Sequence, residues 1–167
     1  MNITQLFLTQ LFTAYAVWLV LSIFILVPKL NQLPKKTVLI ILVIPQMFRY
    51  IGVSVAASPV VTSKDIPIEL AQHIAIGDWV TAICAITAFI FLSVNSRLAI
   101  ASVWVLNMVG FADQIMTMTR ATKAGLANYM DAAWYVPTVL LPIMTTSHIL
   151  IFYYLLKKKK KTTANNV

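Results

Sequence analysis

The chain has 167 residues, of which 60% are hydrophobic and only 11% charged, and its mean hydropathy is +0.84. Water-soluble domains carry about 25% charged residues, so this composition excludes an ordinary soluble domain and indicates a protein of the lipid bilayer. The net charge of +8 does not favour a nucleic-acid partner, because five of the 13 basic residues form one run, Lys157 to Lys161, directly after an apolar segment. Anionic lipid headgroups are the expected partner of that run, at about 1 kcal/mol per charge.

Five segments reach the length of about 20 mostly apolar residues that a membrane-crossing helix needs. Pro28 ends the first of them and Pro59 follows the second, while Asn95-Ser96-Arg97 closes the third. The polar–apolar alternation of a membrane β-barrel is absent from the sequence. The sequence therefore predicts an all-α integral membrane bundle of five transmembrane helices in one domain, residues 1–156, followed by a disordered basic tail, residues 157–167. The predicted spans are about 4–27, 37–57, 68–94, 98–119 and 130–156.

The distribution of basic residues predicts the orientation of the bundle, because cytoplasmic loops carry an excess of Lys and Arg. With the N-terminus outside and the C-terminus in the cytoplasm, the basic residues on the cytoplasmic side are Lys29, Lys35, Lys36, Arg97 and the five terminal lysines. The outer loops then carry only Lys64, Arg120 and Lys123. This asymmetry favours an odd number of helices.

Three charged residues lie inside predicted spans, namely Arg49, Asp78 and Asp113. A charge at the centre of a membrane helix costs about 2.5–3.5 kcal/mol, so we expect these side chains to face the bundle interior and to pair. Depth, counted at about 1.5 Å per residue from the outer helix ends, places all three in the outer half of the bilayer. The same count places His148 near the cytoplasmic face, apart from the others. The candidate ligand-binding residues are Arg49, Asp78, His73, Asp113, Asn107, Gln46 and Gln114.

Helical spacing assigns these residues to three faces. The third segment has a small-residue stripe, which allows close helix approach, formed by Ala71, Ala75, Asp78, Ala82 and Ala85. The second segment offers Gln46, Arg49, Val53 and Ala56, with Gly52 beside them. The fourth segment offers Val103, Asn107, Gly110, Gln114 and Thr117. We expect the three faces to meet, with Arg49 opposite Asp78.

Several interpretations of the polar residues stay open. A buried Arg–Asp pair can fix helix register without any ligand, whereas ionisable groups inside a membrane usually mark a functional site. Arg120 lies two turns beyond Asp113 and could reach it. His73 fits an interfacial position, and His148, after two threonines and a serine, fits a hydrogen bond to a neighbouring helix. Pro45, Pro137 and Pro142 are expected to kink their helices.

The sequence excludes several kinds of chemistry. The single cysteine, Cys84, rules out an intrachain disulfide and a redox CxxC motif. No HExxH, GxSxG or glycine-rich phosphate loop is present. We expect no metal and no cofactor, since zinc needs three or four close ligands and the depth difference between His73 and His148 excludes a haem shared by them.

One set of short motifs resembles a family of small multi-pass bacterial inner-membrane proteins without an established activity. The motifs are Phe48-Arg49-x-x-Gly52, Gly77-Asp78 and Trp104-x-x-Asn107-x-x-Gly110-x-x-Asp113, followed by Pro137, Pro142 and His148. The resemblance runs from the second segment to the fifth. It implies a bacterial inner membrane and a functional placement of these polar residues.

Three functions are compatible with the sequence. The first is an outward-facing intramembrane polar site that binds a small or lipophilic ligand. The second is an accessory subunit that packs against a membrane protein partner, or against further copies of this chain, through its small-residue faces. The third is an intramembrane acid–base enzyme that acts on a lipophilic substrate through His73, Asp78 and Asp113.

Overall fold

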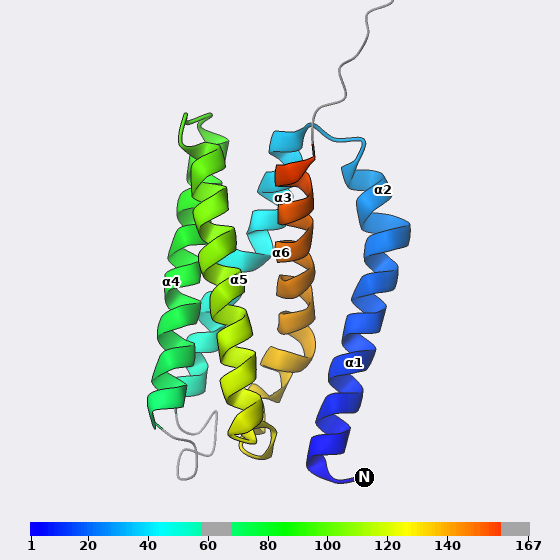
Figure 1. Cartoon of the computed structure of the whole chain (residues 1–167), viewed down its shortest axis with the longest axis vertical. Helices are drawn as coiled ribbons and strands as arrows, with labels where there is room; N and C mark the ends of the chain where they lie inside the picture. Colours follow the sequence, from blue (N-terminus) through cyan, green and yellow to red (C-terminus); the bar gives the residue numbers. More distant parts are fainter. Residues whose placement is uncertain (58–67, 158–167) are drawn as a thin grey trace, which may run out of the picture.

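Five helical passes run alternately in opposite directions and form a bundle in which the first pass begins at one end and the last pass finishes at the other (Figure 1). The computed structural model describes residues 1–57 and 68–157, so Pro59, Lys64 and the lysines at 158–161 lie outside the described residues. All five passes are long and apolar enough to cross a membrane. The described residues form helices and turns and no strand, which confirms the predicted all-α fold with five apolar helices.

The passes have the following bounds. The first consists of α1 (Ile3–Leu21), a π turn η1 (Ser22–Leu26) and α2 (Val27–Leu30). The second consists of α3 (Lys35–Met47) and a 3₁₀ helix η2 (Phe48–Ala56). The third and fourth are α4 (Ile68–Ser93) and α5 (Ala99–Lys123). Two 3₁₀ turns, η3 (Leu126–Asn128) and η4 (Asp131–Trp134), lead to the fifth, which consists of a π turn η5 (Val136–Leu140) and α6 (Leu141–Leu156).

Prolines are accommodated within the first and last passes by π turns. The Val27 N–H donates to the Ser22 carbonyl, five residues back, and Pro28 follows directly. In the last pass the Leu141 N–H donates to the Val136 carbonyl in the same way, just before Pro142. A π turn widens the helix by one residue, which makes room for a ring that cannot donate a hydrogen bond. The predicted end of the first helix at Pro28 is therefore wrong, because the helix continues to Leu30.

The last pass begins later than the sequence predicts, at Val136 instead of near residue 130. Val136 precedes Pro137, and a residue before proline is disfavoured in the α conformation. The chain from Met130 onward therefore forms the separate turn η4 before the helix starts. The other predicted boundaries lie within four residues of the observed ones.

The second pass changes from α to 3₁₀ geometry at Phe48, shortly after Pro45, and remains 3₁₀ for nine residues. Runs of 3₁₀ helix longer than about four residues are uncommon and often mark functional segments. Side chains three apart align in such a helix, and the buried residues of η2 are Arg49, Gly52 and Val55. The predicted face, which continued through Val53 and Ala56 at α-helical spacing, is wrong beyond Arg49, because both of those residues are exposed.

Basic side chains gather at the end of the bundle where the last pass finishes, called here the basic end. Lys35 donates to the Leu155 carbonyl at 2.9 Å, and Lys36 donates to the Asn95 side chain at 2.7 Å. Asn95 itself ends α4 in the left-handed conformation, with φ of 55°, as residues after a helix C-terminus often do. Lys157 donates to the Asn31 side chain at 2.8 Å. These lysines neutralise the negative ends of the helix dipoles of α4 and α6.

Packing differs along the bundle. Toward the basic end, a tight core joins α3, α4, α5 and α6 around Leu39, Leu92, Leu106 and Ile151, all nearly inaccessible. A smaller core lies toward the opposite end, around Val55, Leu70 and Met130. The first helix contributes little to either, since Leu11 is the only buried residue of α1. The interior between the two cores is where the charged side chains lie.

Candidate functional site

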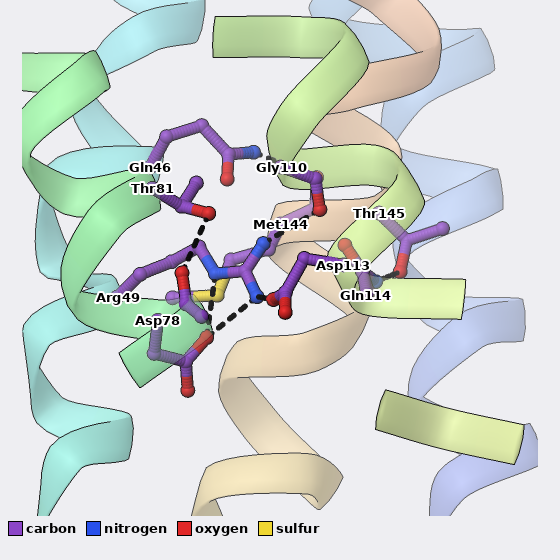
Figure 2. A network of polar contacts seen from close by, with 10 residues as sticks. Gln46, Arg49, Asp78, Thr81, Gly110, Asp113, Gln114, Met144 and Thr145 are labelled. Atoms are coloured by element: carbon purple, nitrogen blue, oxygen red, sulfur yellow. Dashed lines mark hydrogen bonds and ion pairs between the residues drawn. The ribbon is translucent and has the colours of Figure 1, made fainter. Parts of the chain in front are cut away.

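Arg49 is the centre of a buried ion network that joins three helical passes (Figure 2). Its Nε donates to Asp78 Oδ1 at 2.7 Å, its Nη2 lies 2.5 Å from both Asp78 Oδ1 and Asp113 Oδ2, and its Nη1 donates to the Gly110 carbonyl at 2.8 Å. The Arg49 side chain is 4% exposed, and the side chains of Asp78 and Asp113 are 15% and 12% exposed. The structure thus contains the expected Arg49–Asp78 pair and adds Asp113 to it. A planar, forked donor is suited to such simultaneous contacts.

Two of the four glycines make room for the carboxylates of the network, and a third makes room for Thr81 and His148. A Cβ on Gly52 would overlap the Asp78 carboxylate, and a Cβ on Gly77 would overlap the Asp113 carboxylate. A Cβ on Gly110 would lie 2.6 Å from the Thr81 methyl and 2.8 Å from His148 Cε1. Each glycine therefore lets a neighbouring helix approach until its polar side chain touches backbone. This explains why glycines accompany the charged residues in the sequence motifs.

Gln114, on α5 beside the network, connects this helix to α6 and α1. Its amide Nε2 donates to the Thr145 hydroxyl, which in turn donates to the Leu141 carbonyl at 2.8 Å and lies 3.0 Å from the Tyr15 hydroxyl. Because the Thr145 hydrogen is used by Leu141, Thr145 accepts from Gln114, and this fixes the amide orientation. The Gln114 Oε1 atom is then buried with no hydrogen-bond partner among the described residues.

A cavity of about 200 Å³ lies beside the network, in the half of the bundle away from the basic end. Its polar lining comes from Arg49, Asp78, Gln114 and three threonines, Thr4, Thr117 and Thr122, and its remaining walls are largely apolar. The Thr117 hydroxyl, like the Gln114 carbonyl, is buried without a partner within the part of the chain described. The apolar wall includes Phe7, Leu8 and Leu11 of α1, Val55 of η2, Ile74 of α4, and Met118 and Ala121 of α5. A mostly apolar pocket with a few convergent polar groups is the usual form of a small-molecule site.

Two predicted site residues bind α6 and not the ion network. Gln46 is fully buried and donates from Nε2 to the Met144 carbonyl at 2.9 Å. Asn107 is also fully buried, and its Oδ1 lies 2.7 Å from His148 Nδ1 while its Nδ2 donates to the His148 carbonyl at 3.2 Å. Both amides therefore hold the proline-containing last pass against its neighbours.

The predicted position of His148, far in depth from the other polar residues, is wrong. His148 pairs with Asn107 and touches Gly110, whose carbonyl accepts from Arg49. The helical pass begins at Val136 and not near residue 130, so His148 lies about six residues, or about 9 Å at 1.5 Å per residue, closer to the start of the pass than the sequence predicts. The predicted depth difference between His73 and His148, from which a haem shared by them is excluded, is too large by the same amount. The expected hydrogen bond from His148 to a neighbouring helix is present.

His73 and Arg120 stand apart from the network. His73 neither joins the ion pairs nor lines the cavity, and its Nε2 is buried without a partner among the described residues. Arg120 is exposed, and Asp113 binds Arg49 instead. In the segments that the structure describes, no group of three or more His, Cys, Asp or Glu side chains could hold a metal ion.

The cavity wall contributed by α1 was not predicted. The N-terminal segment is apolar on all sides, so no periodicity distinguishes the face that carries Phe7 and Leu11. Two polar contacts hold this helix in place: the Trp134 indole donates to Gln10 Oε1 at 2.5 Å, and Tyr15 contacts Thr145. Gln10 and Tyr15, two polar residues within the apolar first segment, were the signal that could have indicated its docking side.

A comparison with family models gives a match over residues 6–156, to a family described as a domain of unknown function, DUF8737. The chain belongs to the DUF8737 family. The match extends over all five passes and includes every residue of the ion network, so the expected membership of an uncharacterised family is confirmed. Neither the curated proteins nor the solved structures contain a match to this DUF8737 chain.

Proposed function

We propose that this protein spans the bilayer with five helices and uses the cavity beside Arg49 and Asp78 to bind a small or lipophilic ligand. The observation that carries the proposal is a cavity of about 200 Å³ with an ion network at its edge. Two buried polar atoms on the cavity wall, Gln114 Oε1 and Thr117 Oγ1, have no hydrogen-bond partner among the described residues. Leaving a buried polar atom unpaired costs about 1–3 kcal/mol. A ligand that pairs with both atoms would remove that cost.

A purely structural role explains the ion pairs but not the cavity. If the network served only to fix helix register, close packing around it would be expected, as in other protein interiors. The cavity instead adjoins Asp78 and Gln114 directly. The accessory-subunit and enzyme alternatives have no comparable observation in their favour.

We further propose that the cavity faces the outer side of a bacterial inner membrane. The basic end carries Lys29, Lys35, Lys36, Arg97 and Lys157, and the cavity lies in the opposite half of the bundle. Cytoplasmic placement of the basic end agrees with the positive-inside rule and would put the remaining lysines of the tail against anionic headgroups.

Native mass spectrometry of the chain, released from mild detergent, tests ligand binding. We expect a bound small molecule on the wild-type protein and its loss in Ala121→Phe, because Ala121 lines the cavity and a phenyl ring there would fill it without touching the ion network. Ala112→Phe is the matched control, since Ala112 is exposed on the same helix.

The same adduct on the wild type and on both variants, or no adduct on any of them, would count against the proposal. Equal thermal unfolding midpoints of the two variants would show that loss of the adduct does not arise from misfolding.

A further inference from the structure

The hydrogen-bonding character of the cavity wall restricts the chemistry of its ligand. Asp78 lines the cavity, and its Oδ2 receives no hydrogen bond from the described residues, as the lower oxygen of Asp78 in Figure 2 shows. Gln114 Oε1 and Thr117 Oγ1 are likewise without partners in the described parts of the chain. A carboxylate oxygen and an amide carbonyl oxygen can only accept, and a hydroxyl can accept. A ligand that satisfies all three groups must therefore bring donors.

The only cation at the cavity is already used by the protein, as far as the described residues show. All three nitrogens of the Arg49 guanidinium donate internally, to Asp78, Asp113 and the Gly110 carbonyl. A carboxylate or phosphate ligand would therefore meet an arginine whose charge is already matched by two carboxylates. The arginine thus holds the two acids in place, and the site is not built to receive an anion.

The charge balance of the network also favours a cationic ligand over an anionic one. In its ionised form the network holds one positive group, Arg49, and two negative groups, Asp78 and Asp113, which leaves one negative charge without a counter-ion among the described residues. Unpaired charge is costly away from water, and a cationic donor at Asp78 Oδ2 would neutralise it. A charge-assisted hydrogen bond is also about twice as strong as a neutral one.

The size of the cavity limits the apolar part of the ligand. A buried cavity of about 150 Å³ accommodates benzene, with its six heavy atoms. By the same proportion, the cavity of about 200 Å³ holds a molecule of about eight heavy atoms. Its walls, from Phe7 and Leu11 to Met118 and Ala121, would contact hydrocarbon.

We infer that the ligand is a small amphiphilic amine, bound with its ammonium group at Asp78, Gln114 and Thr117 and its apolar body between α1 and α5. This inference rests on the proposed function, because it names the chemical class that the same cavity takes. It goes beyond that function in assigning a cationic head, which the presence of an arginine in the site would not suggest.

Three probes of nearly equal size separate the possible head groups: 2-phenylethylamine, 2-phenylethanol and phenylacetate. Their dissociation constants would be measured by calorimetry on the full chain in nanodiscs at neutral pH, with empty nanodiscs as the blank. We expect the ammonium probe to bind about tenfold more tightly than the alcohol, in line with the strength of charge-assisted hydrogen bonds. We expect no binding of phenylacetate.

Thr117→Val supplies a variant that retains the ion network and nearly the same volume. It should weaken binding of the amine by about two- to tenfold, the usual net effect of one hydrogen bond, while Ala112→Val should leave the affinity unchanged.

Equal binding of the alcohol and the amine, or tighter binding of phenylacetate, would overturn the cationic head group and leave the cavity site intact. If none of the probes binds, a native adduct that Ala121→Phe removes would show that only the ligand class is wrong. If no probe binds and no native adduct is found, the proposed function is wrong as well.

Discussion

Replacement of Arg49 by alanine should destabilise the protein by about 3–5 kcal/mol, the range found when one partner of a buried ion pair is removed. The reason is that Asp78 and Asp113, whose side chains are only 15% and 12% exposed, would lose the group that binds both. Arg49→Lys should lower the free energy of unfolding by a smaller amount, because one ammonium group keeps a positive charge but cannot reproduce the separate contacts of three nitrogens. Reversible unfolding in mixed micelles measures the free-energy differences.

Arg97→Ala is the matched control for this prediction. Arg97 is exposed in the connection between α4 and α5, and exposed substitutions usually change stability by less than about 0.5 kcal/mol. The combined variant Arg49→Leu, Asp78→Asn, Asp113→Asn should be more stable than Arg49→Ala, because it leaves no unpaired charge. An Arg49→Ala protein as stable as Arg97→Ala would show that the guanidinium does not hold the two acids together.

Gly52→Ala should destabilise the protein by about 1–3 kcal/mol, the cost of overpacking a filled interior. A glycine-to-alanine change inside an ordinary helix would instead stabilise it by about 1 kcal/mol, so the sign of the effect is informative. The added methyl group would overlap the Asp78 carboxylate and push it away from Arg49. Gly77→Ala should act in the same way through Asp113.

The coupling between Gly52 and Asp78 distinguishes this mechanism from a general effect on helix packing. In an Asp78→Ala background the carboxylate is gone, so Gly52→Ala should cost much less than in the wild type; contacting residues commonly couple by about 0.5–3 kcal/mol. Ala112→Val, at an exposed position of α5, serves as the control for added volume. Additive effects of the two substitutions, or stabilisation by Gly52→Ala, would contradict the geometry.

The sequence predicted the parts of this arrangement that depend on hydropathy and charge. The five apolar passes follow from composition, and Arg49 pairs with Asp78 because a charge inside an apolar segment has few other places to go. The small-residue stripe of α4 also lies where expected, since Ala75, Ala82 and Ala85 are buried. These features depend on α-helical spacing, which holds in the third and fourth passes.

Prediction failed where the helices depart from α geometry. The 3₁₀ segment η2 turns Gly52 and Val55 inward in place of Val53 and Ala56, and a change of helix type leaves no mark in hydrophobic periodicity. The late start of the last pass displaced the expected depth of His148 and separated it from Asn107, its actual partner. Both departures occur close to prolines, which remove backbone donors without determining which alternative geometry replaces the α-helix.

An experimental structure of the chain purified from its native membrane into lipid nanodiscs tests the central claim most directly. The claim predicts density for a small bound molecule between α1, α4 and α5, in contact with Asp78 and Gln114, beside a guanidinium that binds both aspartates. A collapsed cavity filled by the protein's own side chains, or Arg49 and the two aspartates turned separately toward the acyl chains, would contradict it.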